Sequence, residues 1–108
     1  MKEDLFENTT GISSEEALTV IESFFKKELP QFELTEKVAN HSAYFTVTFR
    51  KDDIEIILSS GRLRFEHSFK INGKEYPLRQ FDSRMDNVLV TSEKNIRFTL
   101  DAIKRFLS

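Results

Sequence analysis

The chain of 108 residues contains no cysteine and no tryptophan, and only three glycines and two prolines. Without cysteine it can form no disulfide framework, no thiolate nucleophile and no thiolate metal site. The three glycines stand apart from one another, which excludes a glycine-rich phosphate loop. No apolar run approaches the ~20 residues that a membrane-spanning helix needs, and the first residues lack the apolar segment of a secretory signal. We therefore expect a cytoplasmic protein without a membrane partner.

What the chain does contain is typical of a globular domain with a large apolar core. Hydrophobic residues make up 39% and charged residues 31% of the chain, a mixture that excludes the disordered class. The aromatic residues are eleven phenylalanines and two tyrosines. Because phenylalanine has no polar group to keep near water, most of these rings are expected inside.

The charges are unevenly distributed although the net charge is only −2. Residues 1–36 carry three basic and nine acidic side chains, whereas residues 37–108 carry thirteen basic and nine acidic ones. The first third therefore has a net charge of −6 and the remainder +4. Such a polarised molecule can present one end to a charged partner.

Two segments carry the pattern of amphipathic helices. Ser13 with Glu16 three residues later is typical of a helix N-cap, and Pro30 predicts the end of this first helix. Its apolar face consists of Ala17, Leu18, Val20, Ile21, Phe24, Phe25 and Leu29. Thr91 or Ser92 is expected to cap a final helix, whose apolar stripe consists of Ile96, Leu100, Ala102, Ile103, Phe106 and Leu107.

Between these helices, apolar and polar residues alternate with the period of two that is typical of strands. The apolar rows are Phe45, Val47 and Phe49; Ile54, Ile56 and Leu58; and Leu63, Phe65, His67, Phe69 and Ile71. Asn72-Gly73 predicts a tight hairpin, and Pro77 predicts that the returning strand, 74–78, lies at an edge of the sheet. A further strand with one apolar row is expected from Phe32, Leu34 and Val38.

The segments after the hairpin are less regular. Residues 79–87 show no period and are expected to form an irregular connection, and Val88-Leu89-Val90 is either a short strand or a buried approach to the final helix. The sequence thus predicts an α+β fold with an N-terminal helix, a four- to five-stranded antiparallel meander sheet and a C-terminal helix. Both helices are expected on one face, which makes two layers.

We expect residues 1–11 to form a flexible N-terminal tail and residues 12–108 to form a single α+β domain. Eight residues are expected to be buried in one core cluster: Ile21, Phe24, Phe45, Val47, Ile56, Phe65, Ile103 and Leu107.

The titratable residues form no recognisable catalytic or metal-binding motif. His41 lies in an expected turn, and His67 lies on the inward row of its strand between Phe65 and Phe69. A lone histidine there is most often a hydrogen-bonded core residue, and lining a pocket is its alternative role. No further histidine lies at metal-ligand spacing, so we expect neither a metal nor a cofactor.

The candidate binding surface is basic. Arg62, Arg64 and Lys70 share the outward row of one expected strand, and Arg79 and Arg84 follow in the irregular connection. These residues can form one recognition surface, unless Asp82 and Asp86 neutralise the arginines locally. The alternative surface is acidic and consists of Glu15, Glu16 and Glu22 on the wet face of the first helix.

Three functional hypotheses follow. The first is a non-enzymatic protein-binding domain of the inhibitor, adaptor or toxin-neutralising immunity type. The second is a small-molecule-binding domain or minor enzyme, with a pocket between helix and sheet that His67 lines. The third is nucleic-acid binding through the arginine-bearing sheet face, which the acidic balance of the chain disfavours. We expect another protein as the partner, and a homodimer remains open.

Overall fold

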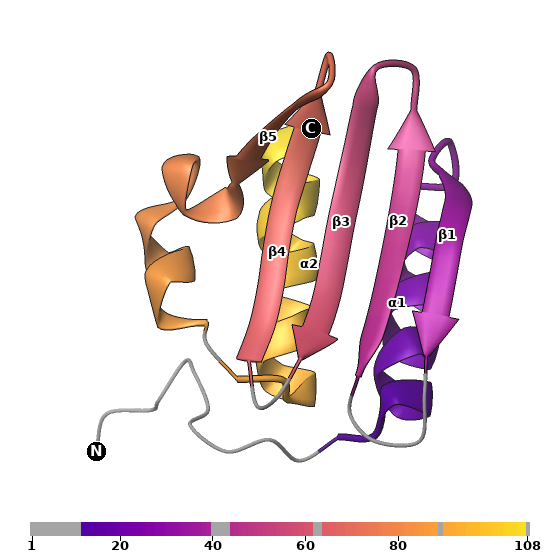
Figure 1. Cartoon of the computed structure of the whole chain (residues 1–108), viewed down its shortest axis with the longest axis vertical. Coiled ribbons are helices and arrows are strands. Elements are labelled where there is room, and N and C mark those ends of the chain that lie inside the picture. Colours follow the sequence, from indigo (N-terminus) through magenta and orange to yellow (C-terminus); the bar gives the residue numbers. More distant parts are fainter. Residues whose placement is uncertain (1–11, 40–43, 62–63, 89, 108) are drawn as a thin grey trace.

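The computed structural model describes residues 12–39, 44–61, 64–88 and 90–107. Its elements in chain order are α1 (Ser14–Glu28), β1 (Glu33–Ala39), β2 (Phe45–Lys51), β3 (Ile54–Gly61), β4 (Arg64–Ile71), β5 (Lys74–Pro77), the 3-10 helices η1 (Leu78–Gln80) and η2 (Ser83–Asn87), and α2 (Glu93–Leu107). Both α-helices lie behind the sheet in Figure 1, which confirms the predicted two-layer α+β fold. The expected tail lies outside the described residues. Neither described α-helix is long and apolar enough to cross a membrane.

The five strands form one antiparallel meander in the order β1-β2-β3-β4-β5. Residues 52–53 form the turn between β2 and β3, and residues 72–73 form the turn between β4 and β5. In the hairpin between β4 and β5, Asn72 and Gly73 have φ angles of 53° and 82°. Positive φ at both positions is the type I′ geometry that the Asn-Gly pair favours, so the predicted hairpin is confirmed.

The inward rows of β2, β3 and β4 build the core against the helices. At the centre of this packing, the ring of Phe25 on α1 stacks on that of Phe49 on β2 with centroids 3.8 Å apart. Six of the eight expected core residues are buried: Ile21, Phe45, Val47, Ile56, Phe65 and Ile103. The prediction is wrong for Phe24 and Leu107, which are only partly buried and pack on the margin of the core. Phe25, the neighbour of Phe24, turns toward the sheet instead, with 1% of its surface exposed.

The predicted apolar row on β1 is also wrong. A register shift between Leu34 and Glu36 changes which side chains face the helices. Leu34 pairs with the buried Phe49, but Val38 pairs with Thr46 on the opposite face and is 59% exposed. A bulge inserts one extra residue into a period of two and thereby reverses the side chains that follow it.

The caps of both α-helices agree with the sequence. Ser13 Oγ accepts a hydrogen bond from the Glu16 amide at 3.1 Å. At α2, Ser92 is the capping residue, because its Oγ accepts from the Asn95 amide at 3.1 Å. The two helices are joined by an ion pair between Glu28 and Lys104. The hydrogen bond from Lys104 lowers the pKa of the Glu28 carboxyl.

The connection between β5 and α2 is more ordered than the sequence indicates. Residues that lack any period form the consecutive 3-10 helices η1 and η2. Val88 then leads into α2 as a buried residue outside any strand. In Figure 1 this segment stands beside β4 at the open side of the sheet, next to the short strand β5.

Candidate functional site

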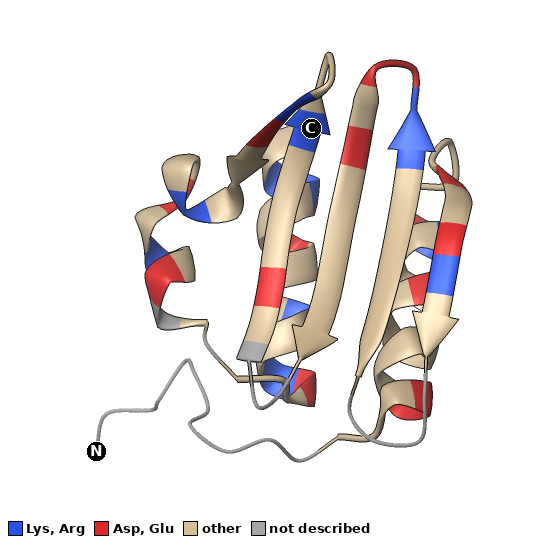
Figure 2. Cartoon of the chain, viewed as in Figure 1, with Lys and Arg blue, Asp and Glu red and all other residues tan. Residues whose placement is uncertain are grey.

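The outer face of the sheet carries balanced charges. Lys70 on β4 pairs across the ladder with Glu55 on β3 and with Glu75 on β5, so acidic neighbours flank it on both sides. Figure 2 shows that the charged segments of β2 and β3 lie only at one end of these strands. Arg62 and the side chain of Arg64 lie outside the described part of the chain.

The two arginines of the irregular segment lie near aspartates. Both oxygens of the Asp82 carboxylate accept hydrogen bonds from the Arg84 guanidinium, at 3.0 and 2.6 Å, and these bonds lower the pKa of Asp82. Arg84 also lies over the ring of Phe98 on α2. Arg79 is held more loosely, with 3.9 Å between its Nε and the nearest Asp86 oxygen.

The acidic residues of α1 are occupied locally. Glu15 and Glu16 stand in the first turn of the helix, where negative charge is favourable. Glu16 accepts a hydrogen bond from the Ser13 hydroxyl at 3.1 Å. Glu22 forms an ion pair with Lys37 at 3.3 Å and thereby ties α1 to β1. Helix capping and packing therefore account for these three side chains.

A groove lies where β4 lacks a partner strand. β4 has eight residues and β5 has four, so the ladder covers only Ser68–Ile71. Within the described residues, no strand pairs with the other half of β4 on that side. Pro77 is the last residue of β5, and its nitrogen points away from β4, to the side on which an edge strand needs no donor. The chain then leaves the sheet as η1 and η2, and a cavity of about 260 Å³ remains between these turns and β4.

The register of the hairpin determines which backbone groups face this groove. Ile71 and Lys74 flank the two-residue turn and therefore form a hydrogen-bonded pair. Every second residue of β4 points its backbone groups to the same side. The N–H and C=O groups of Phe65 and His67 consequently point away from β3, toward the groove.

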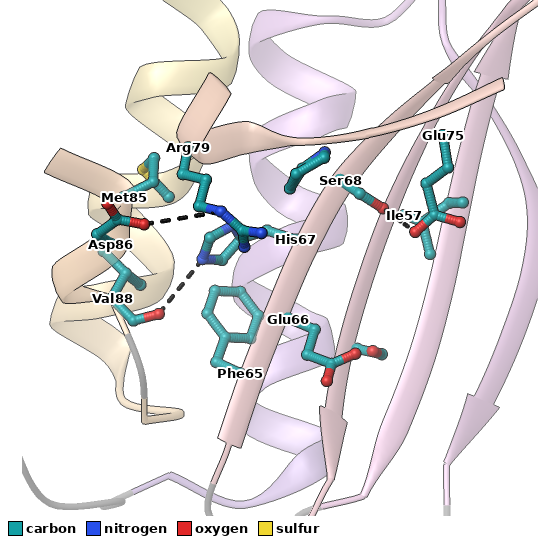
Figure 3. Close-up of a pocket in the computed structure, with 12 residues that line it drawn as sticks. Ile57, Phe65, Glu66, His67, Ser68, Glu75, Arg79, Met85, Asp86 and Val88 are labelled. Atoms are coloured by element: carbon teal, nitrogen blue, oxygen red, sulfur yellow. Dashed lines mark hydrogen bonds and ion pairs between the residues drawn. The ribbon is translucent and has the colours of Figure 1, made fainter. Parts of the chain in front are cut away.

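His67 forms the polar floor of the groove (Figure 3). Its Nε2 lies 3.3 Å from the carbonyl oxygen of Val88 and is assigned as the donor, because a carbonyl can only accept. In the neutral ring Nδ1 then carries a lone pair, and this atom is buried without a hydrogen-bond partner. Burial lowers the pKa of His67, as does the positive charge of Arg79 to a smaller degree. The site thus holds a neutral imidazole with an unused acceptor.

This lowered pKa predicts a loss of stability in mild acid. As pH drops below about 6.5, the unfolded chain binds a proton more readily than folded His67, so the free energy of unfolding should fall. The contribution is lost between the unfolded pKa and the lower folded pKa, and stability is highest above both. Urea unfolding of the wild type and His67→Gln at a series of pH values measures this, since His41 is present in both chains.

NMR titration of the imidazole checks the same prediction directly. A folded-state pKa of His67 above about 6.5 would contradict it. In Arg79→Gln the pKa should rise relative to the wild type, because one positive charge that opposes protonation is removed.

Opposite charges stand on the walls of the groove (Figure 3). Arg79 and Asp86 come from the η1–η2 side, whereas Glu66 and Glu75 come from β4 and β5. Glu75 also accepts a hydrogen bond from the Ser68 hydroxyl at 3.0 Å. The groove therefore offers a cationic donor and several carboxylate acceptors, while Nδ1 of His67 is buried. These groups suit a polar ligand that has both donors and acceptors, as a peptide backbone has.

Sequence reasoning identified two residues of this site and missed the others. His67 and Arg79 were candidates for different reasons, and the fold brings them to the same groove. Asp86 was named only as a residue that neutralises the arginines, and Glu66 and Glu75 were not singled out. Pro77 is the sequence signal from which the groove could have been predicted, because it marks the end of the return strand. A return strand of four residues cannot cover a strand of eight.

The arrangement offers no metal centre in the described ranges, where no three histidine, aspartate or glutamate side chains gather closely enough to hold an ion. Comparison with protein-family models, with curated proteins and with solved structures finds no match to this chain. The geometry of the groove is therefore the basis on which a function can be inferred.

Proposed function

We propose that this chain is a non-enzymatic protein-binding domain that takes up an extended segment of its partner along the open half of β4. The observation that supports this proposal most directly is the difference in length between β4 and β5. An unpaired strand edge is a template for another strand, whose main chain supplies the affinity and whose side chains supply the specificity. An inhibitor, an adaptor or an immunity protein can use such an edge.

The other edge of the sheet is less suited to strand addition. All residues of β1 are exposed, but the register shift after Leu34 distorts this strand, and Lys37 lies on its inward row. Bulges and inward-pointing charges are the features by which proteins protect an edge from pairing. The open half of β4 has an adjoining cavity instead, with hydrogen-bonding groups on its floor and walls.

The environment of His67 favours binding over catalysis. A histidine that activates a serine, threonine or cysteine nucleophile lies within hydrogen-bond distance of its hydroxyl or thiol. Here Nε2 is directed to a backbone carbonyl, and Nδ1 has no partner in the described part of the chain. The proposal that the chain is not an enzyme rests on this geometry.

A small polar molecule is the second candidate ligand. The cavity of about 260 Å³ is just below the ~300 Å³ at which typical ligand pockets begin, and His67 is among the polar residues that line it. Nucleic acid is less well supported, because Glu55 and Glu75 flank Lys70 on the outer face and would repel phosphates.

Amide hydrogen exchange of the free protein tests the open edge. We expect the amides of Phe65 and His67 to exchange much faster than those of Glu66 and Phe69, which the ladders protect. On addition of the partner, the two fast amides should become protected. Equal protection of Phe65 and Phe69 in the free protein would show that this edge is already occupied.

Two substitutions at one position separate strand addition from binding of a small ligand. His67→Val removes the imidazole but keeps the backbone N–H, whereas His67→Pro removes both. The hydrogen bonds between β4 and β3 stay the same in His67→Pro, because the N–H of residue 67 points away from β3. A partner protein captured from the native cell at low salt should be retained by folded His67→Val and lost by His67→Pro. Equal loss in both variants would favour a ligand that needs only the imidazole.

A further inference from the structure

An exposed group of aromatic rings lies where η1 meets the end of α2. The ring of Phe81 is 4.3 Å from that of Phe106, and both rings contact Phe69 of β4, at 5.3 and 5.0 Å between centroids. Tyr76 of β5 stands beside Phe81 at 6.3 Å. We call Phe81, Phe106 and Tyr76 the aromatic patch. Phe69 beneath it is completely buried, so the patch rests on the core.

The exposure of the patch is costly for an isolated molecule. Phe81 is 38% exposed and Phe106 is 44% exposed, and neither ring has a polar atom that benefits from water. Burial of apolar surface is worth roughly 25 cal/mol for each Å² removed from water. Clustered exposed rings, in contrast to single ones, mark interaction surfaces.

The surroundings of the patch indicate what covers it. A shallow hollow of about 220 Å³ is lined by the two phenylalanines and by two residues of opposite charge, Asp82 and Arg105. Asp82 belongs to the η1–η2 connection and Arg105 to α2. The patch therefore combines an apolar centre with one negative and one positive charge at its margin.

We infer that a second copy of this chain covers the aromatic patch in a two-fold symmetric dimer. In such an interface the same surface is used twice, so that residue i meets residue j of the other copy and j meets i. Rotation about an axis through the hollow brings Arg105 of each copy to Asp82 of the other, while the phenylalanines pack at the centre. The charge pattern is thus complementary to itself.

Both charged groups have room for this contact. Arg105 forms a long ion pair with Asp101, at 3.7 Å, and its side chain is 52% exposed. Asp82 already accepts three hydrogen bonds from Arg84, which leaves one of the about four acceptor positions of a carboxylate. The dimer also leaves the groove beside β4 accessible, because the hollow and the groove share no lining residue.

Charge reversal tests the dimer by restoring it between two different variants. In Arg105→Glu, acidic residues face each other twice across the interface, and in Asp82→Lys, basic residues do. In an equimolar mixture, a heterodimer of the two variants contains two attractive pairs. Sedimentation velocity between about 1 μM and about 1 mM should show a wild-type dimer at the upper end. Each variant alone should dissociate at least about tenfold more readily, and the mixture should recover the dimer.

Further variants keep the result interpretable. Arg97→Glu reverses an exposed charge elsewhere on α2 and should leave the dimer unchanged. Phe106→Glu places a charge at the centre of the patch. This variant should be a monomer that pairs with neither charge-reversal variant. It tests the interface even if Asp82→Lys does not fold. A wild type that stays monomeric over the whole range would overturn the inference. So would folded reversal variants whose mixture remains monomeric.

Discussion

Phe69→Ala should lower the free energy of unfolding by about 3–5 kcal/mol. Phe69 lies in the middle of β4 with none of its surface exposed, and its ring contacts those of Phe81 and Phe106. Truncation removes the transfer free energy of the ring and leaves a cavity that the sheet cannot close, because the ladders on both sides hold β4 in place. Urea unfolding followed by circular dichroism measures the loss.

Phe81→Ala is the matched control for this experiment. It removes the same side chain from a neighbouring, partly exposed position, so its cost should be clearly smaller. A loss below about 1 kcal/mol for Phe69→Ala would mean that the inward and outward residues of β4 are assigned wrongly. Removal of an outward-facing ring would lower the free energy of unfolding only slightly. The slope of the free energy against urea concentration should stay the same in all three chains if they unfold in one step.

Thr91→Val should cost about 1–3 kcal/mol, because it leaves a buried hydroxyl without a partner. Ser60 at the end of β3 and Thr91 before α2 share a hydrogen bond of 2.5 Å between their hydroxyl oxygens. Only 5% of Ser60 and 1% of Thr91 is exposed, so water cannot replace the missing partner. The bond joins the sheet to the start of the last helix, 31 residues further along the chain.

The double variant Ser60→Ala with Thr91→Val completes the cycle. It removes both hydroxyls and should therefore be more stable than Thr91→Val alone, since no buried polar group is left unpaired. Thermal or urea unfolding of the four chains gives the coupling energy. If the two single losses simply add in the double variant, the hydroxyls are not coupled and the contact contributes nothing specific.

Local patterns predicted the elements well where the chain supplies its own signal. The cap at Ser13, the hairpin at Asn72-Gly73 and the inward row through Phe65 and Phe69 follow from contacts between near neighbours in sequence. The errors arose where a local pattern is compatible with two different structures. Val38 continues an apolar row only if β1 has no bulge, and a bulge depends on pairing with β2.

The candidate site could be predicted only in part. That His67 is inward follows from the alternation along β4, and that Arg79 is exposed follows from its polar surroundings. That both line one groove depends on where η1 and η2 run after Pro77, and these turns have no periodic pattern. Their course is set by Met85 and Val88, each 1% exposed, which anchor the segment in the core.

The amino-acid sequence by itself determined the order of the elements, the two-layer α+β architecture and the absence of cysteine chemistry, because these depend on composition and on periods of two and 3.6 residues. Only the tertiary structure decided that His67 and Arg79 line one groove with Val88, and that Phe81 and Phe106 meet over Phe69. The physical reason is distance along the chain. Contacts between residues far apart depend on how all the elements pack together, and no local pattern encodes them.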